Sequence, residues 1–245
     1  MGHLLADEIR RAGAVVAGGI ARPGSTRPPP EGVPCLPDIA ALAETSDLVV
    51  DFTHATAVPT HAAALAHAGK PWVLGTSGLS SADEAAVGEA ARRIAVVYAA
   101  NFSTGVNLVL ALAERMAAAL PAESYDAEIV EMHHRQKVDA PSGTAIGIGR
   151  AVARGRGVTL DTVMESGRDG HTGPRMPGGI GFAALRGGQV VGDHTLIFAA
   201  ADEQIALSHR AFDRRSFAAG AVRAAFWTAD RPPGRYSMMD VLGMT

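Results

Sequence analysis

Residues 48–101 read LVVDFTHATAVPTHAAALAHAGKPWVLGTSGLSSADEAAVGEAARRIAVVYAAN, and this stretch decides the fold class. Three short runs, at 48–52, 71–74 and 95–98, are apolar on both faces, as strands of a sheet covered by helices on both sides must be. The segments between them, Thr56–Ala68 and Ser81–Arg93, have helical patterns. Strands that alternate with helices at this spacing indicate βαβ units and a parallel sheet.

Small or polar residues follow each of these predicted strands. They are Asp51, the turn Gly75–Gly78 and the turn Ala99–Asn101. Ligands of open α/β sheets bind at the carboxyl ends of the strands, so the three turns are expected along one ligand-binding edge. The pattern alone leaves open the alternative that these turns are only short connections.

The pattern changes after Ser103. Helices are predicted at 106–120, 144–154 and 218–228, and a strand at 125–131. Beyond Gly157 the sequence predicts short strands with Gly-rich turns, at 158–165, 181–186, 189–191, 194–199 and 204–209. We therefore predict an α/β chain with a Rossmann-like, dinucleotide-binding domain over 1–102. A substrate-binding α+β domain with a mostly antiparallel sheet is expected over 103–214, and the tail of about 215–245 is a candidate to pack back on the first domain.

Composition limits the classes of protein to consider. The chain has 245 residues, of which 47% are hydrophobic and 19% charged, enough for one large or two modest domains and unlike a disordered chain. The formal net charge of −3 offers no electrostatic reason to bind nucleic acid or an anionic membrane. Cys35 is the only cysteine, which excludes an internal disulfide and a thiolate metal cluster. With no long apolar run and no signal-peptide layout, we expect a cytoplasmic protein.

The chain begins at a predicted helix, His3–Ala12, where a nucleotide-binding fold would have a strand and a Gly-rich turn first. Gly2 would be the last glycine of such a turn, so the sheet is expected to lack its first, central strand. Two explanations compete: the true start codon lies upstream, or the protein has lost its phosphate loop. We favour the first because the rest of the site looks intact.

Residues 128–145, EIVEMHHRQKVDAPSGTA, carry the groups suited to chemistry. His133 and His134 follow a predicted strand, and Lys137 comes one helical turn later. A histidine exchanges protons near neutral pH, and an ammonium group can donate a proton or bind an anion. Ser142-Gly143-Thr144 opens the next helix, whose N-terminal amides and dipole suit a carboxylate or a phosphate.

Simpler interpretations of the same residues remain open at this point. A His-His pair also occurs in exposed turns and in zinc sites, although zinc would need further ligands at fitting spacing. His171, His194 and His209 are available, but none shows a recognisable ligand pattern, so we expect no metal. Ser142 and Thr144 could also serve only as a helix cap, worth about 1 kcal/mol.

The block EMHHRQKVDAPSGTA at 131–145 closely resembles the signature of the dihydrodipicolinate reductase family, nicotinamide-dependent enzymes of the diaminopimelate route to lysine. The resemblance extends along nearly the whole chain, in VDFT (50–53), GTSG (75–78), AANFS (99–103), GRDGHTG (167–173), IGFAALRGG (180–188) and GDH (192–194). It implies reduction of 4-hydroxy-tetrahydrodipicolinate, a small dicarboxylate, to tetrahydrodipicolinate with loss of water. The Gly-rich segments after residue 165 look like the family's oligomerisation sheet, so the resemblance also implies a homotetramer.

The resemblance assigns roles to the residues of this block. It implies that His133 is the acid/base residue and Lys137 the proton donor, and that His134 contacts the substrate. The turn of Ser142, Gly143 and Thr144 would hold one substrate carboxylate, in agreement with its place at a helix N-terminus. Arg214, in an R-x-x-F pattern, is expected to meet the substrate as well.

On the cofactor side the resemblance implies NADPH or NADH. The residues expected to line the nicotinamide and its ribose are Gly75, Thr76, Ser77, Ala99, Ala100, Asn101 and Phe102. Met1 and Gly2 match the end of the family's Gly-x-x-Gly-Arg-Met-Gly loop. Many members carry an acidic residue at the end of the second strand, where this chain has Ala21 followed by Arg22. Arg22 could accept a 2′-phosphate, which favours NADPH slightly and leaves dual use open.

Two other functions compete with this one. Another Rossmann-type oxidoreductase, such as a semialdehyde or homoserine dehydrogenase, should show a catalytic cysteine or a different Lys/Asp pattern, whereas Cys35 lies in a proline-rich loop. A non-catalytic paralogue could bind a dicarboxylate without the dinucleotide. The presence of both His133 and Lys137 argues against such a paralogue.

Overall fold

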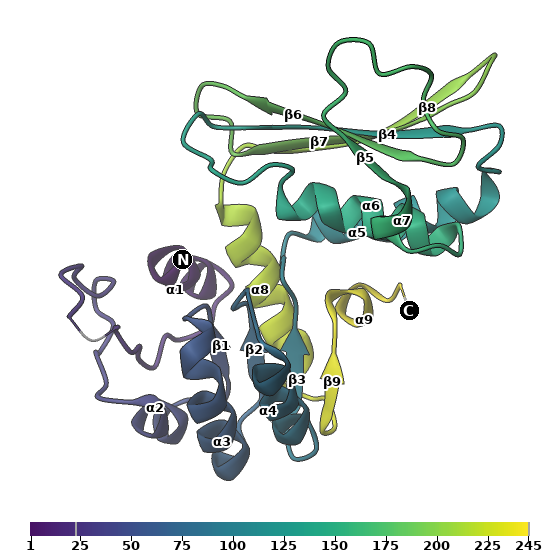
Figure 1. Cartoon of the computed structure of the whole chain (residues 1–245). Helices are drawn as coiled ribbons and strands as arrows, with labels where there is room; N and C mark the ends of the chain where they lie inside the picture. The colour runs from purple at the N-terminus through teal and green to yellow at the C-terminus, as the bar shows by residue number, and fades with distance from the viewer. Residues whose placement is uncertain (23, 245) are drawn as a thin grey trace. The chain divides into compact units, whose positions relative to one another are not determined.

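A computed structural model of the chain describes residues 1–22 and 24–244. The chain divides into two compact units (Figure 1). Unit 1 comprises residues 1–104 and 215–245, and unit 2 comprises residues 105–214. Each unit has its own sheet and its own hydrophobic core.

Unit 1 is built on a four-stranded parallel sheet in the order β1-β2-β3-β9. The strands are β1 (Val49–Asp51), β2 (Trp72–Leu74), β3 (Ala95–Tyr98) and β9 (Gly234–Tyr236). Its helices are α1 (Gly2–Arg11), α2 (Ile39–Thr45), α3 (Val58–Ala68), α4 (Ser81–Ala91), α8 (Arg215–Thr228) and α9 (Met238–Leu242), with a short 3-10 turn at Ala55–Ala57. The C-terminal segment thus supplies one strand of this sheet.

Helices cover both faces of this sheet. Successive side chains of a strand point to opposite faces, and the apolar side chains of these strands therefore need cover on both sides. Trp72 and Leu74 pack against α2, α3 and α4, and Val73 between them packs with α1, α8 and α9. All three side chains are fully buried. The predicted Rossmann-like arrangement of a parallel sheet between helices is confirmed.

Residues 14–20 are an apolar run that could have formed a strand, yet they join no sheet. Their contact is an isolated parallel bridge between Gly19 and Cys35. Gly18 and Gly19 explain part of this, since glycine lacks a side chain to pack and weakens a strand interior. Among the described residues, β1 pairs with β2 and is the edge strand of this sheet.

Unit 2 is a five-stranded sheet in the order β5-β6-β4-β7-β8. Its strands are β4 (Asp126–His133), β5 (Met164–Ser166), β6 (Ile180–Arg186), β7 (Gly192–Ala199) and β8 (Gln204–Ala211), and its helices are α5 (Thr104–Ala119), α6 (Gly143–Gly155) and α7 (Leu160–Val163). The longest ladders, β4–β7 and β7–β8, are antiparallel, and β6 pairs in parallel with both β4 and β5. The predicted α+β class of this half is confirmed.

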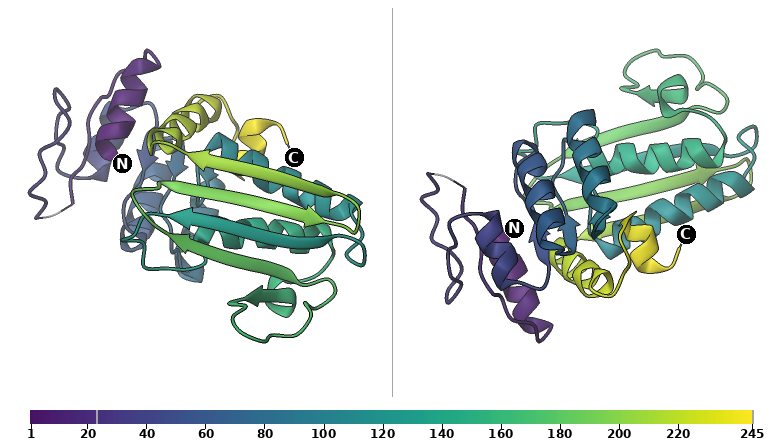
Figure 2. Two further views of the ribbon diagram at one scale, coloured as in Figure 1. Left: turned by 90° about the horizontal axis from the view of Figure 1, so that it is seen from above. Right: turned by 90° about the horizontal axis from the view of Figure 1, so that it is seen from below.

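Helices α5 and α6 cover one face of this sheet, as Figure 2 shows from two sides. The inward face carries Ala127 and Ile129 of β4, together with Leu196 and Phe198 of β7, all fully buried. The opposite face carries Val130 and Met132 of β4, Ile197 of β7 and the half-exposed Leu185 of β6. One face therefore packs into the hydrophobic core. The other face carries an apolar stripe that α5 and α6 do not cover.

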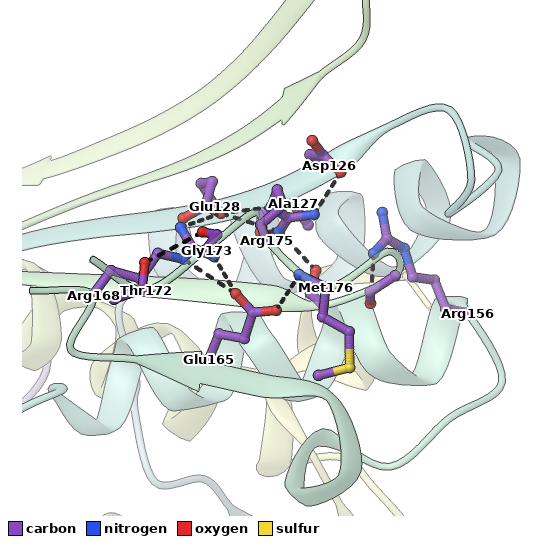
Figure 3. A network of polar contacts seen from close by, with 12 residues as sticks. Asp126, Ala127, Glu128, Arg156, Glu165, Arg168, Thr172, Gly173, Arg175 and Met176 are labelled. Carbon is purple, nitrogen blue, oxygen red and sulfur yellow. Dashed lines mark hydrogen bonds and ion pairs between the residues drawn. The ribbon is translucent and has the colours of Figure 1, made fainter. Parts of the chain in front are cut away.

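The Gly-rich segment 167–179 is tied to the first residues of β4 by a network of charges (Figure 3). Arg175 contacts both Asp126, at 2.5 Å, and Glu128, at 3.0 Å. Arg168 contacts Glu128 at 2.9 Å and Glu165 at 2.5 Å. These side chains are partly exposed, so the network orders the loop more than it adds to stability.

The sequence-based prediction of secondary structure is wrong in two short places of unit 2. The run 158–165 was predicted to be a strand, but it forms the helix α7 before the strand β5 begins at Met164. Thr159 precedes that helix and Asp161 lies in its first turn, and both favour a helix start. Residues 189–191 form no strand but connect β6 to β7.

Candidate active site

The end of β4 in unit 2 presents a buried acid and a histidine side by side. Glu131 and His133 are two residues apart in one strand and so share its inward face. His133 Nδ1 lies 2.6 Å from Glu131 Oε2, and the two residues are only 8% and 1% exposed. Since an ionised carboxylate only accepts hydrogen bonds, Nδ1 is the protonated donor and Nε2 is the nitrogen left to exchange a proton. Gly192 leaves room there, because a Cβ at this position would lie 3.0 Å from Nε2.

Arg186 and the head of α6 keep Glu131 ionised. Nη1 and Nη2 of Arg186 each donate to one carboxylate oxygen of Glu131 at 2.8 Å. The Ser142 N–H donates to Oε1 of the same group at 3.1 Å. Burial raises the pKa of Glu131, but the hydrogen bonds from Arg186, His133 and Ser142 together outweigh it, and the pKa is lowered overall.

Ser142 links the helix α6 to a second histidine. Its Oγ accepts the Ala145 N–H at 3.1 Å as a helix cap and lies 2.9 Å from His194 Nε2. The ring of His194 meets that of His133 edge-on, with centroids 5.1 Å apart. Burial, reinforced by the charge of His133, lowers the pKa of His194 to about 4. His194 is therefore neutral at physiological pH, and its Nδ1 is buried without a hydrogen-bond partner among the described residues.

Lys137 lies in the turn that follows β4, where its backbone N–H donates to the carbonyl of His134 at 3.1 Å. Its ammonium group is clamped by the carboxylate of Asp139, with Nζ 2.7 and 2.9 Å from the two oxygens. Hydrogen bonding and the charge of Lys137 lower the pKa of Asp139. The side chain of Lys137 is 19% exposed, whereas Val138 beside it is 98% exposed. The loop thus holds its lysine inward.

The predicted carboxylate-binding turn does open a long helix. Ser142 is the N-cap of α6, whose first turn contains Gly143 and Thr144. The positive end of a 13-residue helix therefore stands within one hydrogen-bonded cluster with Glu131 and His133. His134 is half-buried at the start of the neighbouring loop, and Arg214 is exposed at the last residue of unit 2.

In unit 1, hydrogen bonds join the turns at the carboxyl ends of the parallel strands. The Gly75 N–H donates to the Asp51 carbonyl at 2.8 Å, and the Thr76 hydroxyl donates to the Thr53 carbonyl at 3.2 Å. The Ala99 N–H donates to the Leu74 carbonyl at 3.2 Å. The edge that the strand ends predicted is therefore continuous across β1, β2 and β3.

A buried pair supports this edge from below. His61 of α3 lies with Nδ1 2.7 Å from Oδ2 of Asp51, and Oδ1 of Asp51 accepts the Thr53 N–H at 2.9 Å. Burial raises the pKa of Asp51, but hydrogen bonds from His61 and Thr53 outweigh burial and the pKa is lowered. The carboxylate thus fixes the turn that follows β1 to a helix beneath the sheet.

Two glycines allow close approach at this edge. A Cβ at Gly75 would lie 2.3 Å from the ring of Phe52, and one at Gly220 would lie 1.8 Å from the Phe102 carbonyl oxygen. Phe102 itself is 1% exposed and stacks at a tilt on Phe52, with ring centroids 5.5 Å apart. Among the predicted cofactor residues, Phe102 therefore has its side chain in the core. Only its backbone lies near the edge of the sheet.

The other predicted cofactor residues lie as follows. Thr76 is buried, Gly75, Ala99 and Asn101 are half-buried, and Ser77 and Ala100 are exposed. Asn101 accepts the Ser103 N–H at 2.8 Å through its side-chain oxygen. Met1 and Gly2 are exposed at the start of α1, and Arg22 is exposed in the loop before α2.

Sequence reasoning assigned no supporting role to the residues that position these groups. In unit 2 they are Glu131, Asp139, Arg186 and His194, and in unit 1 they are Asp51 and His61; Asp51 was placed only at the predicted edge, and His194 was considered only as a metal ligand. The period of two along β4 could have placed Glu131 with His133. Arg186 and His194 stand in motifs, IGFAALRGG and GDH, that carried no assigned role. Their contacts span 55 and 52 residues, so only the pairing of the strands reveals them.

Residues 1–22 and 24–244 contain neither a cluster of metal ligands nor a membrane-spanning helix. No cluster of three or more His, Cys, Asp or Glu side chains in that part of the chain is placed to hold a metal ion. None of the helices described there is both long enough and apolar enough to cross a bilayer.

Comparison with protein families gives two adjoining matches. The family model described as "Dihydrodipicolinate reductase, N-terminus" matches residues 1–102, and "Dihydrodipicolinate reductase, C-terminus" matches residues 105–242. Among curated proteins, the 4-hydroxy-tetrahydrodipicolinate reductase of Granulibacter bethesdensis is 68% identical over 244 residues, covering 100% of this chain and 93% of the relative. That of Acidiphilium cryptum is 62% identical, covering 100% and 94%.

Solved structures resemble the chain in fold. A dipicolinate-bound dihydrodipicolinate reductase from Paenisporosarcina sp. TG-14 matches with a TM-score of 0.71 at 24% identity, covering 88% of this chain and 81% of that one. An amine dehydrogenase from Mycobacterium smegmatis matches with a TM-score of 0.62 at 14% identity, covering 97% and 92%. At these identities the likeness concerns the fold alone.

Proposed function

The chain belongs to the dihydrodipicolinate reductase family, and from that premise we propose how its residues divide the chemical work. It is an NAD(P)H-dependent oxidoreductase that reduces 4-hydroxy-tetrahydrodipicolinate to tetrahydrodipicolinate. The observation that supports our assignment is the buried Glu131–His133 pair beside the head of α6. A proton-exchanging nitrogen and an anion-binding helix end stand there in one hydrogen-bonded cluster.

His133 and Lys137 are the proposed proton-transfer residues. Glu131 holds the proton on Nδ1 of His133, so Nε2 is the nitrogen that takes up and releases a proton. The ammonium group of Lys137 is the second donor, and Asp139 holds it in the loop after β4. General acid catalysis by a positioned side chain typically contributes about 10²- to 10⁴-fold to a rate.

The substrate's two carboxylates determine the remaining proposed contacts. The amides of Gly143 and Thr144, with Ser142 as the cap of α6, bind one carboxylate at the positive end of the helix. His134 contacts the substrate from the loop next to His133, and the guanidinium of Arg214 meets the other anionic group. A dianionic substrate explains why a lysine, a helix N-terminus and an arginine are all required.

The carboxyl edge of the unit 1 sheet fits a dinucleotide. Gly75, Thr76 and Ser77, with Ala99, Ala100, Asn101 and the Phe102 backbone, form two short turns of mostly small residues on that edge, as ligand binding there requires. Met1 and Gly2, at the start of α1, contribute main-chain N–H groups to the same ligand. Arg22 recognises a 2′-phosphate, and we therefore propose NADPH as the preferred cofactor, with NADH also used. When bound, the nicotinamide supplies a hydride.

The reaction balances with one proton from the protein. The substrate loses its C4 hydroxyl group, together with a hydrogen of the neighbouring ring carbon, as water. This leaves a conjugated imine, whose ring C4 would accept the hydride. His133 and Lys137 supply the proton that completes the product, and solvent restores it. Charge and atoms are conserved: substrate, hydride donor and one proton give tetrahydrodipicolinate, oxidised cofactor and water.

We further propose a homotetramer assembled through the unit 2 sheet. The stripe of Val130, Met132, Leu185 and Ile197 lies on the face that α5 and α6 do not cover. Apolar faces of this kind mark interaction sites in soluble proteins. The proposed cellular location is the cytoplasm, where biosynthetic reductases of this kind meet their pyridine nucleotide.

The test is turnover by the purified chain, with the substrate generated in situ and the loss of reduced-nicotinamide absorbance followed. We expect saturable oxidation of NADPH that depends on the substrate, together with a tetrameric mass by light scattering. His133→Gln should retain cofactor binding and lose turnover. Binding of a dicarboxylate without cofactor binding or turnover by the unmodified chain would instead support the alternative of a non-catalytic paralogue that lacks the dinucleotide site.

A further inference from the structure

One arginine of unit 2 contacts the supports of both proposed proton-transfer residues. Strands β4 and β6 pair in parallel with His133 opposite Arg186, which brings the guanidinium over the Glu131 carboxylate. The two-point contact of Arg186 with Glu131 has both N–O distances at 2.8 Å. Such a fork-to-fork pair fixes orientation as well as distance.

The same guanidinium also reaches the loop that carries the lysine. Nη2 of Arg186 donates to the backbone carbonyl of Asp139 at 2.7 Å, and the carboxylate of Asp139 clamps Lys137. Nη1 also donates to the Leu185 carbonyl at 2.6 Å, which anchors the side chain to its own strand. Arg186 is therefore the hub between the histidine end and the lysine end of the cluster.

We propose that Arg186 is a positioning residue that couples His133 and Lys137, by holding the Glu131 carboxylate and the Asp139 carbonyl with one guanidinium. This inference rests on the proposed function of His133 and Lys137. In this role Arg186 acts through Glu131 and Asp139 and does not need to touch the substrate or the cofactor.

A second consequence is electrostatic. Without Arg186 the charge of the Glu131 carboxylate would be unbalanced beside the His133 ring, which would favour the protonated ring. Arg186 balances the charge of Glu131, while the carboxylate orients the ring through its hydrogen bond with Nδ1. The charged or titratable groups around His133 are Glu131 of β4, Arg186 of β6, His194 of β7 and Lys137 of the following loop. Of these, only Arg186 contacts the carboxylate with a permanent positive charge.

The experiment compares Arg186→Ala and Arg186→Lys with the unmodified enzyme, and uses Arg154→Ala as a matched control. Arg154 also donates two hydrogen bonds to one carboxylate, that of Glu114, but both side chains are exposed on α6 and α5. We expect Arg186→Ala to lower kcat by about 10²-fold, because small displacements of catalytic groups have effects of that size, with KM changed less than kcat. Arg186→Lys keeps the charge without the fork and should fall between, and Arg154→Ala should leave kcat unchanged.

Two readouts separate positioning from a general loss of structure. Added guanidinium chloride at low concentration should restore part of the activity of Arg186→Ala and none of that of Lys137→Ala. The limb of the pH profile that His133 governs should move to higher pH in Arg186→Ala. The same upward shift should appear when the His133 ring is titrated by NMR, with its signal assigned through the His133→Gln variant.

The outcomes are distinct. If Arg186→Ala retains kcat within about threefold and the His133 titration does not move, the inference is overturned while the proposed function stands. If the unmodified enzyme has no turnover, the proposed function fails, and the NMR titration alone then decides whether Arg186 sets the pKa of His133. Should Arg186→Ala not fold, as judged by circular dichroism, Arg186→Lys is judged by the same shift of the pH profile and the ring titration.

Discussion

Each unit of the molecule contains one buried carboxylate paired with a histidine Nδ1, and the two pairs are nearly alike in distance. His61 lies 2.7 Å from Asp51 in unit 1, and His133 lies 2.6 Å from Glu131 in unit 2. In both, hydrogen bonds outweigh burial and lower the pKa of the acid. Distance and burial alone would give the two pairs the same role.

Their surroundings differ in what else holds the carboxylate. Glu131 is also bound by both terminal nitrogens of Arg186, whose positive charge balances that of the carboxylate. The second oxygen of Asp51 instead accepts the Thr53 backbone N–H, so that pair fixes a turn. The third partner therefore separates the two pairs: the Thr53 N–H ties Asp51 to a turn, and Arg186 ties Glu131 to the proposed proton-transfer site. The predictions below test that division.

The largest effect is expected from Lys137→Ala. This change removes the proposed proton donor in the loop after β4, and kcat should fall by about 10²-fold or more with the fold intact. Gln136→Ala, in the same exposed loop, is the matched control and should leave kcat unchanged. Steady-state kinetics with both cofactors provide the measurement, and a kcat close to that of the unmodified enzyme would remove Lys137 from the proposed mechanism.

Asp51→Asn should instead affect stability. It removes the charge that holds His61 and the Thr53 turn, and a charged, buried hydrogen bond of this kind contributes about 2 kcal/mol to the free energy of unfolding. The KM for the cofactor should rise while kcat changes little, because the turn is displaced but no proton donor is lost. Denaturant unfolding, with the exposed Asp47→Asn as control, measures the first effect. A loss of kcat equal to that of Lys137→Ala, without a loss of stability, would erase the distinction between the two pairs.

Most of the architecture could be predicted from local patterns. The runs at 48–52, 71–74 and 95–98 do contain parallel strands β1, β2 and β3, and Ser142 does cap the helix α6. These features depend on residues close together in the sequence, where periodicity and capping act. The errors have the same origin, since the run 158–165 is too short for its period to distinguish the four-residue helix α7 from a strand.

The partners within the site could not be predicted in this way. Glu131 meets Arg186 only because β4 and β6 pair in parallel with Glu131 opposite Ala184 and His133 opposite Arg186. A shift of this register by one residue would turn Arg186 to the other face of the sheet. Nothing in the spacing of the motifs specifies that register. The contacts of Arg186 and His194 therefore cannot be predicted from the sequence.

A smaller, pH-dependent effect should come from His194. Burial lowers its pKa to about 4 in the folded protein, below the ordinary value of 6.5, so the unfolded chain binds a proton there first. Stability should therefore fall as the pH drops from about 6.5 towards 4, by about 2–3 kcal/mol in total. In His194→Gln this part of the pH dependence should disappear, whereas the exposed His171→Gln should keep it. Unfolding at several pH values measures it, and equal slopes in all three proteins would mean that His194 is not buried neutral.

The smallest effect concerns the cofactor edge of unit 1, where recognition by an exposed arginine adds little energy. Arg22 is exposed, and ion pairs at such sites contribute about 0.2–1 kcal/mol, so its proposed contact with a 2′-phosphate would give a severalfold preference at most. We expect kcat/KM to favour NADPH over NADH slightly, and Arg22→Ala to bring the two values together, while Arg27→Ala in the same loop leaves the ratio unchanged. Higher salt should shrink the preference of the unmodified enzyme because it screens exposed charges. A preference for NADH above tenfold would refute this role of Arg22, and it would mean that the backbone turns of this edge, rather than a charged side chain, select the nucleotide.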